Sequence, residues 1–66
     1  MHIILNGVSY EVTASTTIRH LLETLYYADK RVAVERNGQI VPKSQHAETF
    51  LQENDSLEIV VAVGGG

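Results

Sequence analysis

The sequence predicts an α+β domain in which a mixed sheet of four to five strands carries one main helix on one face. Three observations lead to this prediction: two Asn-Gly pairs between strand-like segments, one stretch with helical apolar spacing, and a final run of alternating apolar residues. We expect residues 1–66 to form a single domain, whose core rarely contributes more than about 3–5 kcal/mol at this length. A deep catalytic cavity is therefore not expected.

Each Asn-Gly pair indicates a tight β-hairpin, because both residue types tolerate the positive φ angles of a two-residue turn. The pairs are Asn6-Gly7 and Asn37-Gly38. The strands of the two hairpins are expected at residues 3–5 and 8–12, and at residues 32–36 and 39–41. Pro42, which has no N–H group to donate, is expected to end the second hairpin.

Between the hairpins, one segment has the apolar spacing of an amphipathic helix. The residues at positions i, i+3, i+4 and i+7 are Ile18, Leu21, Leu22 and Leu25. We expect a helix over roughly residues 16–27, with Ser15 or Thr16 as its N-cap. A helix that crosses one face of the sheet would bury this stripe.

The segment 43–52 is mostly polar, and we expect a 3₁₀ turn there that places Phe50 in the core. Asn54-Asp55 indicates a further turn, since Asn tolerates left-handed backbone. The expected order is strand, strand, helix, strand, short strand, turn, strand. This order matches the ubiquitin-like β-grasp fold.

The last strand is predicted from Leu57 to Val63, with alternate apolar residues on its inner side. Its other side carries Val60 and Ala62, which are apolar where an antiparallel sheet usually places polar residues. Two interpretations remain open: a central strand covered on both faces, or a docking patch beside the chain end. Val60, Ala62 and Val63 are the candidate partner-docking residues.

Charge argues against nucleic acid as a partner. The formal net charge is −3, and the five basic residues are scattered along the sequence rather than grouped. A mildly acidic surface would suit a protein with a basic face. Glu53, Asp55 and Glu58 gather near the last turn, and solubilising charge is their simplest interpretation.

Composition excludes several other kinds of site. The chain has no cysteine, so disulfides, thiolate nucleophiles and cysteine metal ligands are absent. No metal site is expected, because His2, His20 and His46 are far apart in sequence; we expect all three to be solvated. The apolar run at residues 1–7 is too short for a signal peptide or a membrane span, so we expect a cytoplasmic protein.

The sequence ends in Gly64-Gly65-Gly66, directly after an apolar strand. Glycine has no Cβ, so such a stem can enter a channel that is too narrow for side chains. Disorder without a role is the competing interpretation, because chain ends are commonly disordered. We expect residues 64–66 to form a flexible tail whose terminal carboxylate, on Gly66, is the reacting group.

The sequence resembles the ThiS family of thiamine-biosynthesis sulfur carriers over essentially the whole chain. The resemblance is carried by VAVERNGQIVP at 32–42, NDSLEIV at 54–60 and the terminal VGGG. Asn54 departs from the family, which often has glycine there. The small subunit of molybdopterin synthase is similar in fold and ending, but it is usually longer and often has prolines just before its glycines.

The resemblance implies a protein cosubstrate rather than an enzyme, with no bound cofactor. A ThiF-type adenylyltransferase would use ATP to activate Gly66, and a sulfur donor system such as a cysteine desulfurase would supply the sulfur of a thiocarboxylate. Thiazole synthase, ThiG, would then receive the sulfur, with Gly64 and Gly65 threading the partner active sites. The alternatives are a sulfur carrier for molybdopterin synthesis and a ubiquitin-like modifier or binding module whose glycines form an amide with a lysine.

Overall fold

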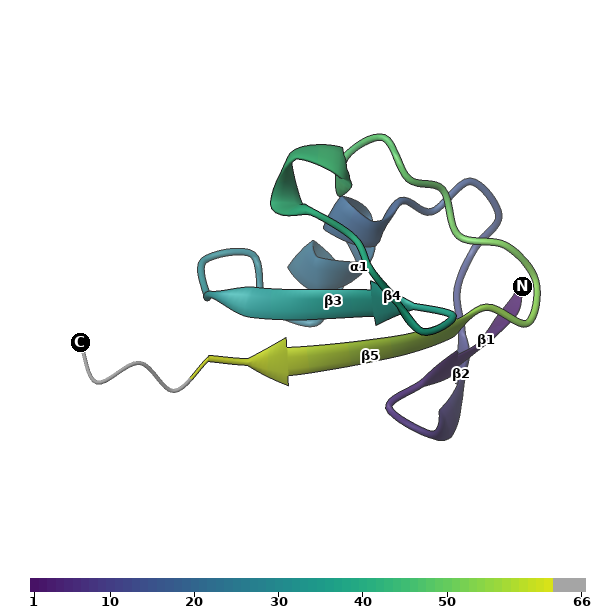
Figure 1. Ribbon diagram of the computed structural model, residues 1–66. Helices are drawn as coiled ribbons and strands as arrows, with labels where there is room; N and C mark the ends of the chain where they lie inside the picture. Colours follow the sequence, from purple (N-terminus) through teal and green to yellow (C-terminus); the bar gives the residue numbers. More distant parts are fainter. Residues whose placement is uncertain (63–66) are drawn as a thin grey trace.

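The computed structural model describes residues 1–62, and the predictions that concern Val63 and the three glycines lie outside this part of the chain. The elements are β1 (His2–Leu5), β2 (Val8–Glu11), α1 (Ile18–Thr24), β3 (Val32–Arg36), β4 (Gln39–Ile40), the 3₁₀ turn η1 (Lys43–Gln45) and β5 (Ser56–Val61). The strands form one sheet in the order β2-β1-β5-β3-β4, with α1 on one face (Figure 1). β1 and β5 are parallel, whereas the other pairs are antiparallel, which confirms the predicted mixed sheet and β-grasp order.

Both hairpins turn through their Asn-Gly pairs, as predicted. Asn6 and Gly7 have φ angles of 50° and 82°, and Asn37 and Gly38 have φ angles of 52° and 86°. Positive φ at both central residues defines the type I′ turn, whose twist matches that of the flanking strands. The dipeptides therefore set the register of each hairpin.

The two turn asparagines also hold the central strand β5 from both sides, which the sequence pattern did not indicate. The Asn6 side-chain oxygen accepts a hydrogen bond from the Ile59 backbone N–H at 2.8 Å. The Asn37 side-chain oxygen accepts one from the Ser56 N–H at 2.9 Å. These bonds connect the turns of β1–β2 and β3–β4 to the one strand that lies between them.

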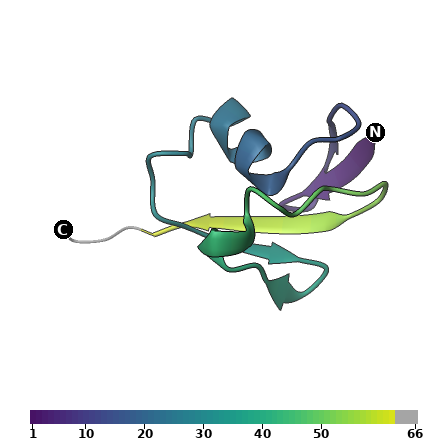
Figure 2. The ribbon, with the colours of Figure 1, turned by 90° about the horizontal axis from the view of Figure 1, so that it is seen from above.

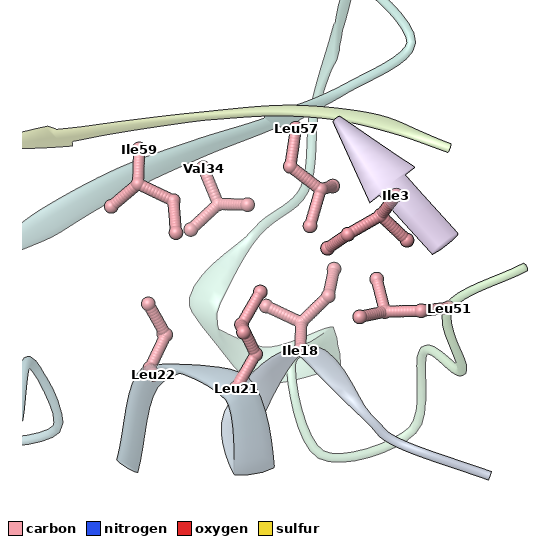
Figure 3. Close-up of a cluster of buried hydrophobic side chains, with 8 residues drawn as sticks. All are labelled: Ile3, Ile18, Leu21, Leu22, Val34, Leu51, Leu57 and Ile59. Atoms are coloured by element: carbon pink, nitrogen blue, oxygen red, sulfur yellow. The ribbon is translucent and has the colours of Figure 1, made fainter. Parts of the chain in front are cut away.

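The core lies between α1 and the sheet (Figure 3). Its buried side chains are Ile3, Ile18, Leu21, Leu22, Val34, Leu51, Leu57 and Ile59. The predicted core position of Phe50 is wrong, because this ring is 53% exposed and Leu51 is buried instead. Residues 49–51 run extended beside the start of α1, where the Leu51 N–H bonds the Thr16 carbonyl at 2.8 Å. Neighbouring side chains of an extended segment point to opposite sides, so only one of the two can face the core.

Helix α1 begins later than predicted, at Ile18, with Thr17 as its N-cap. The Thr17 backbone is extended, and its side-chain oxygen accepts a hydrogen bond from the His20 N–H at 3.1 Å. Thr16 is buried, and its hydroxyl donates to the Thr13 carbonyl at 2.6 Å instead. Ser15 has a φ of 66°, which differs from the extended backbone of an N-cap.

The helix also ends earlier than predicted, at Thr24, in a Schellman motif. The Tyr27 N–H bonds the Leu22 carbonyl at 2.8 Å, and the Tyr26 N–H bonds the Glu23 carbonyl at 3.1 Å. Tyr26 occupies the left-handed position of this motif with a φ of 63°. Glycine usually fills this position, because any Cβ there meets the backbone.

Asp55 stabilises the fold rather than only solubilising the surface, which corrects our expectation. Its carboxylate is buried and accepts hydrogen bonds from Arg36 Nε at 2.9 Å, Asn37 Nδ2 at 3.0 Å and the Gln52 N–H at 2.8 Å. Burial by itself raises the pKa of Asp55, but the bonds from Asn37, Gln52 and Arg36, with the charge of Arg36, outweigh burial and lower it.

The expectation that all three histidines are solvated is wrong for His46, which is 6% exposed. Its Nε2 lies 3.0 Å from the Val41 carbonyl oxygen. A carbonyl can only accept a hydrogen bond, so Nε2 carries a proton. His46 thus connects η1 to the end of the second hairpin.

Replacing Tyr26 with glycine is expected to raise the free energy of unfolding by about 0.5–1 kcal/mol, because glycine adopts left-handed backbone without a Cβ clash. Little packing is lost, since Tyr26 is 86% exposed. Urea denaturation of both proteins measures the change. Tyr27→Gly is the control and should destabilise, because Tyr27 packs partly buried against the core. A loss of stability in Tyr26→Gly would contradict the assignment.

Asp55→Asn is expected to lower the free energy of unfolding by about 2 kcal/mol at neutral pH, because the amide cannot accept all three hydrogen bonds. The folded-state pKa of Asp55 lies below its ordinary value of 3.8, so its contribution is present above that pH. The contribution is lost as the pH falls through the folded-state value. Denaturation of both proteins between neutral pH and pH ~2 should therefore show curves that converge on acidification. A constant difference at every pH would contradict the role given to the carboxylate.

Candidate functional site

The face of the sheet opposite α1 is the candidate site. Figure 1 shows α1 and η1 on the same side of the strands, and no described element lies on the other side. β5 is central in the sheet and runs toward the C-terminal residues of the chain. The uncovered face therefore borders the point where the predicted glycine tail leaves the described part of the structure.

Apolar side chains occupy the end of this face that is nearest the tail. Val60 is 63% exposed, and Ala62 is also exposed. Ala33 lies directly opposite Val60 on the neighbouring strand β3. The interpretation of β5 as a strand covered on both faces is therefore wrong for the described residues, and the predicted exposure of Val60 and Ala62 is confirmed.

Two carboxylates adjoin these apolar residues. Glu35 on β3 and Glu58 on β5 are direct cross-strand partners. Glu35 also pairs with Ile40 on β4, the other neighbour of β3, and Ile40 is 62% exposed. Like charges that face each other across strands repel. Neither glutamate forms an ion pair within residues 1–62. We call this surface the outer patch; it consists of Ala33, Glu35, Ile40, Glu58, Val60 and Ala62.

The last part of β5 is fixed to β3 up to Ala62. Val61 pairs with Val32, and the Ala62 N–H donates to the Arg31 carbonyl at 2.8 Å. The apolar end of the outer patch is thus hydrogen-bonded to the neighbouring strand up to the last residue that the structure describes. Val63, Gly64, Gly65 and Gly66 lie outside the described residues, so their predicted roles are not tested by the structure.

Within residues 1–62, no three His, Asp or Glu side chains gather closely enough to hold a metal ion. No helix of the same part of the chain is long and apolar enough to cross a membrane.

A mixed sheet with this strand order and one α-helix on one face defines a ubiquitin-like β-grasp domain. The ThiS family model matches residues 3–66. A crystal structure of the thiamine biosynthesis protein ThiS from Geobacter metallireducens superposes with a TM-score of 0.85 at 29% identity, and the match covers 100% of both chains. The sulfur carrier protein ThiS of Bacillus subtilis is 41% identical over 63 residues, which are 94% of this chain and 96% of that protein. The chain belongs to the ThiS family.

A second kind of relative is much longer than this chain. A thiazole synthase from Paramagnetospirillum magneticum is 44% identical over 66 residues, which are 100% of this chain but only 20% of that protein. The chain therefore spans about one fifth of the length of the relative. The polypeptide named thiazole synthase thus contains a segment that is similar to this whole chain.

Val60→Thr is expected to change the free energy of unfolding by less than about 0.5 kcal/mol, because the side chain already faces solvent. The same substitution at Val34, which is 1% exposed on the inner face, should cost about 1–3 kcal/mol by burying a hydroxyl. Both variants keep a β-branched side chain, so strand propensity changes little. Equal losses in thermal denaturation of the two variants would show that the outer patch is covered.

Proposed function

We propose that this protein is a sulfur carrier of thiamine biosynthesis that acts as a cosubstrate and not as a catalyst. The observation that supports this most directly is the family match, which extends through the glycine end to residue 66. The exposed outer patch supports the same function, because in the sequence the end of its strand β5 is followed closely by three glycines, which carry no side chain. We assign the cargo to the terminal carboxylate of Gly66.

The chemistry requires a partner enzyme. A terminal carboxylate has a pKa near ~3.5, so it is ionised at neutral pH and is a poor electrophile. A ThiF-type adenylyltransferase would direct a carboxylate oxygen at the α-phosphate of ATP, release pyrophosphate and leave an acyl-adenylate. A sulfur nucleophile would then add to the carbonyl carbon, and AMP would leave with its electron pair. The product is a thiocarboxylate, once any persulfide bond brought by the donor has been cleaved by a thiol.

The outer patch is the docking surface in this proposal. Its apolar end, Val60 and Ala62, would bury against the activating enzyme together with Val63. Glu35 and Glu58, which form no ion pair within residues 1–62, would meet lysine or arginine side chains, which would relieve their mutual repulsion. Gly64 and Gly65 would pass through the narrow entrance of the active site, since they present no side chain.

The sulfur acceptor in this proposal is a thiazole synthase of the ThiG type. The supporting observation is the longer relative of that name, which contains a segment similar to this entire chain. A cysteine desulfurase or similar system would provide the sulfur, and ATP would be bound by the activating enzyme and not by this protein.

Intact mass tests the proposal. Incubation with the cognate activating enzyme, ATP and a sulfur donor should increase the mass by the exchange of one oxygen for sulfur. Deletion of Gly66 should abolish this gain and leave thermal unfolding nearly unchanged, because a terminal residue contributes little to stability. Gly65→Val should also block the gain, because a branched side chain cannot follow the narrow path.

Three outcomes would contradict the proposal. An unchanged mass under conditions that load a known ThiS protein would reject a carrier role. A stable amide with a lysine of another protein would indicate a modifier instead. Transfer of the sulfur only to the large subunit of molybdopterin synthase would assign the carrier to that pathway.

A further inference from the structure

Four of the five basic residues gather at one groove, although they are scattered in the sequence. Two adjoining hollows of about 270 Å³ each share Leu22, Ala28, Lys43 and His46 in their walls. The four cationic side chains that line them are Arg19, Lys30, Arg31 and Lys43. The fifth cation, Arg36, is elsewhere and is bonded to Asp55. We call this region the basic groove.

The fold itself creates this gathering. α1 contributes Arg19, the loop after α1 contributes Lys30 and Arg31, and η1 contributes Lys43. η1 is attached to the helix by a hydrogen bond from the Arg19 N–H to the His46 carbonyl at 3.0 Å. Leu22 and His46 are buried, whereas all four cationic residues are exposed. The groove thus has a packed floor and a charged rim.

The rim keeps a positive excess after its own acids are counted. Asp29 also lines the groove, and Glu23 lies 3.4 Å from Arg19 Nε one helical turn away. Four cations against these two carboxylates leave a local charge of about +2, in a chain whose formal net charge is −3. Lys30 and Lys43 form no side-chain hydrogen bond or ion pair within residues 1–62. Their ammonium groups are therefore available to a partner.

The arrangement fits an extended acidic segment better than a single small anion. Compact phosphate sites usually converge backbone N–H groups on one point, often at a helix N-terminus. Here the cations come from three elements, and the α1 N-terminus is capped by its own Thr17. A row of carboxylates along a peptide can meet such separated cations, with electrostatic complementarity guiding its orientation.

The basic groove and the outer patch lie on opposite faces of the sheet but meet at the end of β5. Arg31 lines the groove, and its carbonyl accepts the hydrogen bond from Ala62, which belongs to the outer patch. Figure 2 shows the loop after α1 descending to the sheet at the end where β5 finishes. A partner in the groove would thus lie next to the base of the tail without covering the outer patch.

We propose that the basic groove binds an acidic peptide segment of a protein partner, as a second recognition surface independent of the outer patch. This goes beyond the proposed sulfur-carrier function and does not depend on it. The charge separation within one small domain would let two partners of opposite surface charge approach the same chain end from different faces.

The test is an NMR titration of the isotope-labelled protein with an alternating Glu-Gly peptide, a matched Gln-Gly peptide and inorganic pyrophosphate. The acidic peptide should shift amide signals from residues 19, 22, 28–31 and 43–47 in a saturable manner. Raising the ionic strength from roughly 0.05 M to 0.5 M should weaken binding strongly, because the rim is exposed to solvent. The neutral peptide should leave the signals unchanged.

Charge variants distinguish this groove from a general attraction. The double variant K30Q/K43Q removes two positive charges from the rim and should weaken binding of the acidic peptide by roughly tenfold. The control S9E/Q52E alters the net charge by the same amount at exposed positions outside the groove, and should change affinity less than about twofold. Thermal unfolding of each variant checks that the fold is retained.

Equal weakening by the two double variants, or equal shifts with the neutral peptide, would overturn the proposal. Absence of saturable binding would also overturn it. Pyrophosphate binding at the groove without peptide binding would replace the proposal with a site for small anions. If loading of Gly66 fails while the peptide titration succeeds, the sulfur-carrier function is rejected and the groove is retained.

Discussion

The central position of β5 is the constraint on which the rest of the structure depends. Its inner side contributes Leu57 and Ile59 to the core, so the strand cannot shift by one residue without turning both side chains to solvent. Its backbone bonds to β1 on one side and to β3 on the other. The side chains of Asn6 and Asn37 add bonds from both turns. The register of this one strand therefore determines which residues form the core and which form the outer patch.

Local chemistry accounts for the features that the sequence predicted well. Asn-Gly pairs favour the positive φ angles of a type I′ turn, and the alternation in the last strand separates Ile59 from Val60 without further information. These signals were enough to predict the two hairpins, the element order of a β-grasp and the apolar part of the candidate site. These features depend on residues that are adjacent in the sequence, so the sequence alone is enough to predict them.

Features that depend on tertiary contacts were missed. Phe50 is the larger apolar residue of its segment, yet Leu51 enters the core because pairing with residues 16–18 sets the direction of that segment. Thr17 became the N-cap because the hydroxyl of Thr16 is used elsewhere. Asp55 and His46 are ordinary polar residues in the sequence, and only the fold supplies the hydrogen-bond partners of their buried side chains. The basic groove was missed for the same reason, since Arg19 and Lys43 are distant along the chain.

The hydrogen bond between Arg31 and Ala62 limits how deeply the chain end can enter a partner. Four residues follow Ala62 in the given sequence. An extended chain advances at most about 3.3–3.6 Å per residue, so these four residues reach at most ~14 Å beyond Ala62. In the proposed function, an enzyme that acts on Gly66 would have its reacting atoms within that depth of the surface that contacts the end of the sheet. If the bond were broken, each further residue released from β5 would lengthen the reach but would also withdraw apolar side chains from the domain. The span available for catalysis and the integrity of the last strand are thus set by the same backbone contact.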